Sequence, residues 1–487
     1  MMDHLFPSPL CYRAAGHRLL LLALLIMLLP GQGCRPEAPP LPRLPEAVER
    51  HPSETARLSF FLTLADSTGP SVRVVISELA ILADQHWVTV TDQTLTLESA
   101  QIAAGQLFLG ARAAVPGRYQ RLRFTVERVE KKGPDGSYQV LAAETFPVEQ
   151  PLPAPLTLES KDSRSLFISW DVEATLQQEN FAPVFTLAEQ VTPLLADLAY
   201  VACPDIDTIF VIRTDRGWVA DSFGLPGSPS HLALDNATDQ ERLLVLAPGE
   251  MAVKLVDLSS QRVIDQFHLP LTSPPTFMTT SPDGRWAYIL EEQSGYLSRL
   301  DLETGHVAAR VRLEHQPLYA AWLPDQQWLA VAVARSQAVL LLTPRELNPV
   351  RTIPTGNAPQ GLLAAAGQLY ITERRDHTVL VYDLNTNQPL ARLEAGLEPR
   401  RLLATDNHVY VSNHRDGTIT VIAPGLPGVI REIRGLGRPL EMIYDPSRRQ
   451  VLVGEEETGG VAVIDAANRL RDRIIFGARP AGMVMMP

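Results

Sequence analysis

The chain has 487 residues, of which 45% are hydrophobic and 20% charged, and its formal net charge is −12 at pH 7. This composition excludes a globally disordered chain, and the length allows two or more domains. The acidic balance argues against nucleic-acid binding, because that function needs a basic face and no run of lysine and arginine is present. Forty prolines and thirty glycines among short apolar runs favour many short strands over long helices, so we predict an all-β fold.

Residues 1–33 are expected to be a targeting segment. Basic residues precede an apolar run from Leu19 to Pro30, which is shorter than the roughly 20 residues that a membrane-spanning helix needs. Cleavage is therefore favoured over a retained membrane helix. The segment resembles a bacterial lipoprotein signal, in which a small residue, here Gly33, precedes the cysteine that receives the lipid. The resemblance implies lipidation of Cys34, whereas the alternative is ordinary signal-peptidase cleavage with an incidental cysteine.

Cysteine usage fits this expectation. After cleavage, Cys34 and Cys203 are the cysteines that remain, so an acylated Cys34 would leave no intramolecular disulfide. Cys203 lies in an apolar strand, and we expect a buried, inert thiol there rather than a redox or metal-binding group.

Two segments and a linker precede the repeats. Residues 34–54 are proline-dense and polar, which predicts a tether. Residues 55–190 contain alternating apolar runs, such as LSFFLTL and LFISWDV, separated by turns, and these indicate an antiparallel β-sandwich followed by a linker at 191–197. The order of the runs and the Gly-x-Tyr corner at Gly117 and Tyr119 resemble a domain of unassigned function in bacterial surface lipoproteins. That family transfers no catalytic residue.

Residues 198–487 contain the strongest signal. Prolines recur at intervals of about 40 residues, the length of a four-stranded propeller blade, and each precedes a short apolar strand. The seven are Pro229, Pro275, Pro317, Pro359, Pro399, Pro439 and Pro480. The segment from Leu198 to Phe223 lacks a first strand, and the closing ARPAGMVMM is a first strand without successors. We therefore predict a seven-bladed β-propeller closed by strands from both ends of the array.

The repeats also resemble a known family. Tyr410–Asn413, followed by the strand at Ile419–Ile422, comes closest to surface-protein propeller repeats with a Tyr-Val-Thr-Asn signature and a Val-x-Val-Ile-Asp strand. Val461–Asp465 repeats the second half of this signature. The resemblance implies a YVTN-like propeller of seven blades.

Two sets of positions are candidates for binding. By symmetry, the turns between second and third strands share one rim of the ring, and this rim carries charges of both signs. Its residues include Arg374, His377, His414, Arg415, Glu291, Glu455 and Glu456. Residues beside the repeated prolines should approach the central channel, where Arg400, Arg438 and Arg479 form the group least expected from packing. The rim could hold a protein or a charged ligand and the arginines an anion, whereas the alternative is a set of solvated turns.

Catalytic and metal motifs are absent from the sequence. It has no glycine-rich phosphate loop, HExxH, CxxC or Gly-x-Ser-x-Gly. The aspartates at the ends of repeat strands are expected to start turns rather than to bind calcium. They are Asp257, Asp301, Asp383 and Asp465. His377 and His414 could share a metal only with a third ligand, so we expect neither a metal nor a cofactor.

These features predict an exported, lipid-anchored protein of the cell envelope, at the outer membrane or cell surface, that acts as a binding or scaffold module. Its partner would be an unknown envelope or surface protein. The alternative is a propeller enzyme, a lactonase-like hydrolase or an oxidoreductase accessory protein, with a site at the channel mouth. A third possibility is a structural envelope component that associates with itself.

Overall fold

The computed structural model describes residues 55–66, 69–102, 105–188, 197–235, 242–313, 316–425 and 428–486. The expected signal segment, the tether, Cys34 and most of the expected linker lie outside these residues. All described residues belong to one compact unit, residues 41–487. In the part of the chain that is described, no helix is both long and apolar enough to cross a membrane.

The described residues between positions 55 and 188 form two β-sheets and two short helices. One sheet has the order β10 (Val184–Ala188), β9 (Ser163–Asp171), β1 (Ala56–Leu64) and β5 (Leu107–Ala114). The other has the order β3 (His86–Thr91), β2 (Val72–Ala83), β6 (Gly117–Lys132) and β7 (Tyr138–Ala142), with β4 (Leu95–Glu98) paired to β2 and β8 (Phe146–Leu158) to β6. The helices are α1 (Ser99–Ile102) and α2 (Val172–Gln177).

The two sheets share one hydrophobic core. It takes Phe60 from β1 and Phe124 from β6, among many other side chains. Successive side chains of a strand point to opposite faces, and Phe61 accordingly belongs to a different cluster, together with residues beyond position 198. β1 is thus buried on both faces, which explains its nearly continuous apolar sequence.

The expectation of a purely antiparallel arrangement is wrong for one strand pair. β1 runs parallel to β9, with Phe60 opposite Leu166. A parallel pair requires a long crossover, and the whole second sheet lies between these two strands in the sequence. The neighbouring pairs β1–β5 and β9–β10 are antiparallel, as expected.

From residue 198 onward, the described chain forms seven four-stranded antiparallel sheets. One sheet joins both ends of this region, in the order β13 (Trp218–Gly224), β12 (Thr208–Arg213), β11 (Leu198–Cys203) and β38 (Gly482–Met485). The next three are β14 (His231–Leu234), β15 (Arg242–Ala247), β16 (Ala252–Asp257) and β17 (Arg262–His268); β18 (Phe277–Thr280), β19 (Trp286–Glu291), β20 (Tyr296–Asp301) and β21 (Val307–Arg312); and β22 (Pro317–Leu323), β23 (Trp328–Val333), β24 (Ala338–Leu342) and β25 (Pro349–Pro354). The last three are β26 (Pro359–Ala365), β27 (Gln368–Glu373), β28 (Thr378–Asp383) and β29 (Gln388–Glu394); β30 (Pro399–Ala404), β31 (Val409–Asn413), β32 (Thr418–Ile422) and β33 (Val429–Ile433); and β34 (Pro439–Asp445), β35 (Gln450–Glu455), β36 (Gly460–Ile464) and β37 (Leu470–Ile475).

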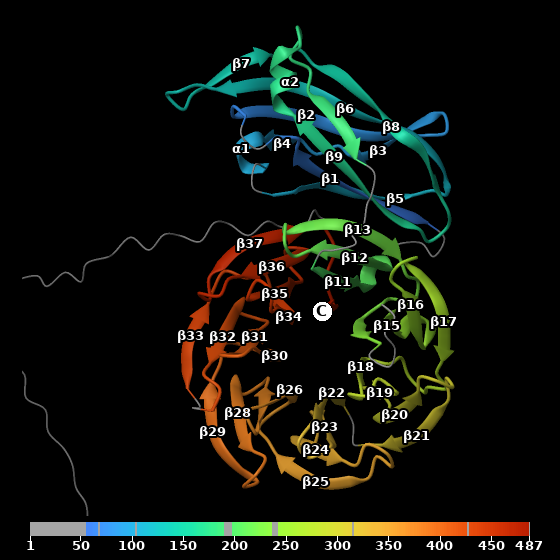
Figure 1. Ribbon diagram of the computed structural model, residues 1–487, viewed down its shortest axis with the longest axis vertical. Helices are drawn as coiled ribbons and strands as arrows, with labels where there is room; N and C mark the ends of the chain where they lie inside the picture. Colours follow the sequence, from blue (N-terminus) through green and yellow to red (C-terminus); the bar gives the residue numbers. More distant parts are fainter. Residues whose placement is uncertain are drawn as a thin grey trace, which may run out of the picture. The chain divides into compact units, whose positions relative to one another are not determined.

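These sheets follow one another around a ring (Figure 1). Their first strands contact each other in the order β14, β18, β22, β26, β30, β34 and β38, and β38 contacts β14 again. The hydrophobic core is divided among the spaces between neighbouring sheets. One cluster, for example, combines Leu323 and Ala330 with Leu369 and Ile371 of the next sheet. Middle strands are therefore buried on both faces, whereas an outer strand such as β21 alternates between half-buried and exposed residues.

The two ends of the repeat array meet in one sheet, as the sequence predicts. β38 pairs antiparallel with β11, with Val484 opposite Tyr200. Its neighbour on the other side is β14, and a Cβ atom added to Gly482 would overlap the carbonyl oxygen of Ser230. Only glycine allows this close approach of the two first strands.

The first two sheets pack against the ring, and both partners contribute side chains to the contact. Phe61, Phe108 and Phe167 join a cluster with Phe476 of the ring. The side chain of Gln106 pairs with β13 in the way that a neighbouring strand would. Its amide donates to Val219 O at 3.2 Å and accepts from Val219 N at 3.0 Å. This side chain occupies backbone groups at the outer edge of β13.

The burial of Cys203 and the turns at the repeated aspartates match the expectation. Cys203 is fully buried in a hydrophobic cluster, and burial raises the pKa of its thiol. Asp301 accepts hydrogen bonds from the backbone N–H groups of Glu303 and Thr304, at 3.0 and 3.1 Å. Asp383 does the same with Asn385 and Thr386. These carboxylates start turns.

Candidate functional site at the mouth of the ring

One face of the ring carries the turns that follow second strands and the links that lead into first strands. In four sheets, the backbone N–H after the second strand donates to the carbonyl of the residue before the repeated proline. These pairs are Ala334 to Gln316 (2.9 Å), Arg374 to Ala358 (3.1 Å), His414 to Glu398 (3.1 Å) and Glu456 to Arg438 (3.3 Å). We call these eight residues, with Arg400, the mouth. The four acceptor residues have φ values of 68°, 55°, 54° and 54°, a region that few non-glycine residues adopt. The same unusual backbone conformation therefore recurs at this position in all four sheets.

Glu456 is the centre of a charged cluster in the mouth. Its Oε2 lies 2.9 Å from His414 Nε2 and 3.8 Å from a guanidinium nitrogen of Arg438. Burial favours the neutral acid, but the hydrogen bond to His414 and the charges of Arg438 and Arg400 outweigh it, and the pKa of Glu456 is lowered. The carboxylate therefore stays ionised and holds these side chains together.

Arg400 is a half-buried cation of the mouth. A guanidinium nitrogen lies 3.5 Å from Glu398 Oε2, while its Nε is buried without a hydrogen-bond partner among the described residues. Burial lowers the pKa of Arg400, and the charge of Arg374 adds to this effect, although Glu456 and Glu398 oppose it. An incoming anion would relieve the desolvated charge, because it supplies an acceptor and a compensating negative charge.

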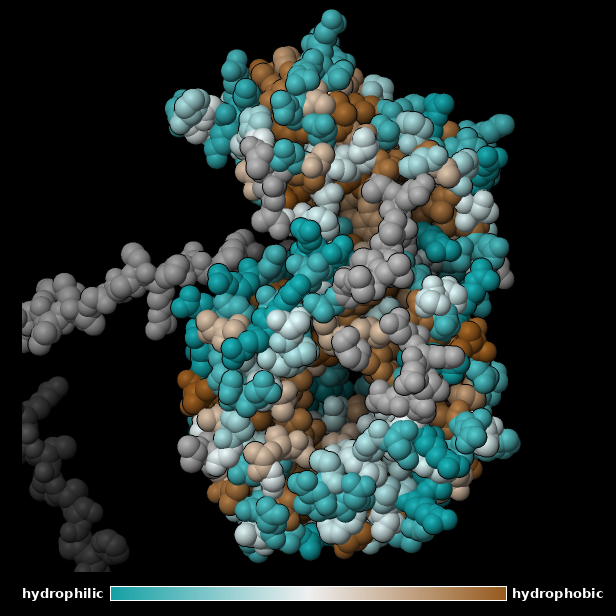
Figure 2. Space-filling view, viewed as in Figure 1, coloured by the Kyte–Doolittle hydropathy of each residue, from teal (hydrophilic) through white to brown (hydrophobic). Residues whose placement is uncertain are grey.

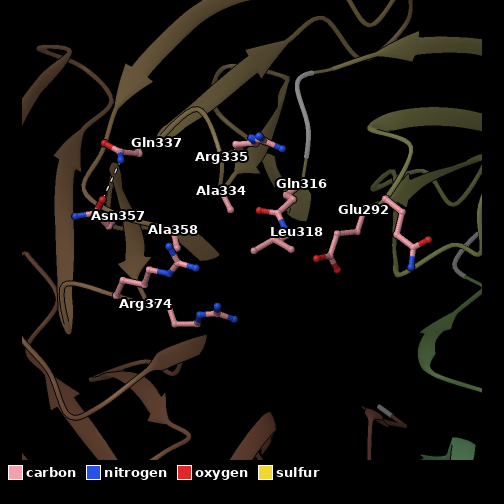
Figure 3. Close-up of a pocket in the computed structure, with 11 residues that line it drawn as sticks. Glu292, Gln316, Leu318, Ala334, Arg335, Gln337, Asn357, Ala358 and Arg374 are labelled. Atoms are coloured by element: carbon pink, nitrogen blue, oxygen red, sulfur yellow. Dashed lines mark hydrogen bonds between the residues drawn. The ribbon is translucent and has the colours of Figure 1, made fainter.

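A pocket of about 570 Å³ adjoins the mouth (Figure 3). Its charged and polar lining includes Glu292, Gln316, Arg335, Gln337, Asn357, Arg374 and Arg375, and small alanines lie between them. In Figure 3, Gln316, Arg374 and Glu292 extend toward the same open space. Gln337 is fixed by a 2.9 Å hydrogen bond to Asn357. Figure 2 shows that the ring is hollowed near its centre.

Several residues singled out from the sequence come together here. Arg374, Arg400, His414, Arg438 and Glu456 lie in the mouth, linked by the contacts above. His377 is attached to it as well, because its Nδ1 accepts the backbone N–H of Glu398 at 3.1 Å. Arg479 is separate, with its guanidinium 4.0 Å from Asp205, and Arg415 is an exposed turn residue. The mouth therefore contains five of these residues, His377 adjoins it, and Arg479 and Arg415 lie outside it.

Two glutamates expected on the rim are instead fully buried. Glu291 accepts hydrogen bonds from Arg310 and from the backbone N–H of Thr272 and Ser273, at 2.7, 2.9 and 3.0 Å. Glu455 similarly accepts from Arg473 and from Gly437 N, each at 2.8 Å. Each is the last residue of a second strand, and its carboxylate points into the interior between the sheets. There it accepts hydrogen bonds from backbone N–H groups of the segment that leads into the first strand.

Glu373 is the third member of this buried series, in the sheet midway between those of Glu291 and Glu455. Arg392 donates to both of its carboxylate oxygens, at 2.6 and 2.8 Å, and Gly356 N donates at 2.6 Å. Burial by itself favours the neutral acid and so acts to raise the pKa of Glu373. The hydrogen bonds have the larger effect, and the pKa of Glu373 is lowered. The series ties alternate outer strands to the links and makes the mouth a rigid frame.

Within the described ranges, no group of three or more histidine, cysteine, aspartate or glutamate side chains is placed to hold a metal ion. Sequence reasoning missed Glu398 and gave little weight to Arg335 of the pocket. The signal for Glu398 was available, because it precedes Pro399 in the position that Arg438 has before Pro439.

Comparisons with known proteins address the fold. No family model matches the sequence, and no curated protein matches it. A protein of unknown function from Desulfotomaculum acetoxidans is similar in structure, with a TM-score of 0.53 at 11% identity over 60% of this chain and 99% of that one. At this identity the likeness shows the fold alone. The ring is a β-propeller.

Two enzymes also resemble the propeller more distantly. Hydrazine synthase from Kuenenia stuttgartiensis has a TM-score of 0.47 at 16% identity, over 53% of this chain and 89% of that one. Virginiamycin B lyase from Staphylococcus aureus has a TM-score of 0.46 at 13% identity, over 52% of this chain and 87% of that one. Neither likeness bears on what this propeller binds.

Proposed function

We propose that this chain is an exported, lipid-anchored binding module of the cell envelope, whose seven-bladed propeller holds the anionic group of a partner or ligand at its mouth. The first two sheets form a β-sandwich that separates the membrane tether from the propeller. Each of the seven four-stranded sheets is one blade, and β38 completes the blade that begins with β11.

The charge of the mouth carries the proposal. The protein has a net charge of −12, yet the mouth and its adjoining pocket contain Arg335, Arg374, Arg375, Arg400 and Arg438 against Glu292, Glu398 and Glu456. A local cationic excess on an acidic protein attracts anions to that place and repels them elsewhere. Arginine also matches the planar geometry of carboxylate and phosphate.

Binding is favoured over catalysis by the position of His414. His414 belongs to the mouth, but its side chain is 2% exposed and its Nε2 is bonded to Glu456. A general base must reach the proton that it removes. His414 instead connects two blades through the Glu456 carboxylate.

The double substitution Arg400→Ala with Arg438→Ala is expected to weaken binding of inorganic phosphate at least about tenfold, because a charge-assisted hydrogen bond is worth ~1.5–3 kcal/mol. Isothermal titration calorimetry at low and moderate salt measures this affinity. The thermal unfolding midpoint should change little, because the Arg438 side chain is exposed and because removing Arg400 also removes the cost of its desolvation.

The matched control is Arg312→Ala with Arg449→Ala, which removes the same charge from two exposed positions outside the mouth. This control should bind phosphate nearly as the wild type does. If both double variants lose the same affinity, phosphate responds to net charge alone and the mouth is not the site.

The membrane anchor has its own test. Metabolic labelling with a fatty acid should mark the wild-type protein and leave Cys34→Ala unlabelled, with the Cys203→Ala variant labelled as the control. Equal labelling of wild type and Cys34→Ala, or none in either, would remove lipidation from the proposal and leave the binding site untouched.

A further inference from the structure

A second pocket lies on the opposite face of the propeller from the mouth. It has a volume of about 600 Å³. Its lining combines residues of β19, β20 and β22 with three turns, between β18 and β19, between β22 and β23, and between β24 and β25. Because neighbouring strands are antiparallel, turns between first and second strands share a face with turns between third and fourth strands. The mouth is built from the other turns, so the two sites are separate.

Arg299 of β20 is the most buried cation of this pocket. It is only 8% exposed, and the described residues provide no carboxylate that forms an ion pair with it. Its guanidinium donates to the carbonyl oxygens of Pro344, at 3.4 Å, and Arg345, and its Cζ lies 4.2 Å from the centroid of the Trp286 ring. Carbonyl groups and an aromatic face leave a buried positive charge without a compensating negative charge.

Two hydrogen-bond donors of the pocket lack an acceptor. Arg299 Nε and Trp322 Nε1 are both buried and have no hydrogen-bond partner among the described residues. The acidic residue of the lining, Asp283, accepts from the hydroxyl of Ser281 and from Arg285 N. Arg299 and Trp322 therefore lack acceptor oxygens, and Arg299 also lacks a negative charge beside it.

Aromatic side chains form one wall of the pocket. The rings of Tyr288 and Trp322 lie 6.4 Å apart and are inclined by 32°, and the Tyr288 hydroxyl donates to Pro344 O at 3.2 Å. Burial raises the pKa of Tyr288 to about 12, so it stays neutral and adds no negative charge. Such a wall stacks planar rings, and the pocket volume suits a small organic molecule.

We propose that this pocket binds a small aromatic carboxylate, whose ring lies against Trp322 and Tyr288 and whose carboxylate pairs with Arg299. The acid supplies the charge that Arg299 lacks and the acceptors that Arg299 Nε and Trp322 Nε1 lack. Its planar ring covers apolar surface at the boundary of two blades. This binding is independent of the anion site at the mouth.

The probe is 2-naphthoate, with 2-naphthamide as its uncharged analogue of the same shape. Titration calorimetry should show naphthoate binding to the wild type at least about tenfold tighter than naphthamide binding. Arg299→Met keeps an unbranched apolar stem but removes the charged guanidinium, and it should weaken naphthoate binding at least about tenfold. Trp322→Phe keeps a ring but removes the N–H, and about a threefold to tenfold loss is expected.

Controls separate this site from the mouth and from folding. Arg312→Ala and the double variant Arg400→Ala with Arg438→Ala should bind naphthoate as the wild type does. The thermal midpoint of Arg299→Met should not fall, because removing an uncompensated buried charge relieves its desolvation cost. No naphthoate binding to the wild type, equal binding of the amide, or unchanged affinity in Arg299→Met and Trp322→Phe would overturn the proposal. So would a lower midpoint for Arg299→Met with unchanged affinity, since Arg299 would then serve only to hold the turn.

Discussion

A chain that ends at Arg479, and so lacks β38, is expected to lose the closed propeller. β38 contributes Met483 to one hydrophobic cluster and Val484 to another, and burying one such side chain is worth ~1.5–3 kcal/mol. Its removal also leaves the backbone groups of β11 unpaired along an apolar strand, which favours association between molecules. We expect a destabilisation of about 5 kcal/mol or more together with aggregation, a large share of the stability of an ordinary domain.

Size-exclusion chromatography and thermal unfolding measure this result, and a point substitution refines it. Gly482→Ala should lower the free energy of unfolding by about 1–3 kcal/mol, because the added Cβ would overlap Ser230 O at the closure. Gly105→Ala is the matched control, since a Cβ there meets no atom within 4 Å. A truncated protein that remained monomeric with a native midpoint would show that closure by β38 does not stabilise the ring.

The repeat could be predicted because it is a local signal. Each repeated proline lies at or just before a first strand, where the missing N–H removes no internal ladder bond, and Pro317, Pro359 and Pro399 begin theirs. Residues at equivalent positions of neighbouring repeats then converge by symmetry. This is why Arg374, His414 and Glu456, each the first residue after a second strand, could be placed in one region from spacing alone.

The rest depended on partners that are distant in the sequence. The parallel pairing of β1 with β9 joins strands about 100 residues apart, and no local pattern specifies direction across such a distance. The burial of Glu455 depends on Arg473 of another strand and on Gly437 N, neither of which marks the glutamate as internal. Arg299 was equally hidden, because a lone arginine in a strand normally indicates an exposed position.

The buried glutamate series gives a second large expected effect. Glu455 is 0% exposed, and the Arg473 side chain that it pairs with is 15% exposed. Glu455→Ala leaves Gly437 N and the Thr458 hydroxyl without this acceptor, and it leaves the guanidinium with the carbonyl oxygen of Gly435 but without its carboxylate. Breaking a buried pair by removing one partner costs ~3–5 kcal/mol, and we expect a loss of this size in urea unfolding.

Two further variants show whether the loss of stability in Glu455→Ala comes from the broken ion pair. Glu457→Ala removes the same charge two residues away at an exposed position, so its effect should stay within about 0.5 kcal/mol. Adding Arg473→Met to Glu455→Ala removes the orphaned cation and should restore part of the lost stability, because the two side chains are coupled. If Glu455→Ala and Glu457→Ala were equally stable, the carboxylate would not hold the link to the outer strand. The rigid frame of the mouth would then rest on the apolar contacts between blades instead.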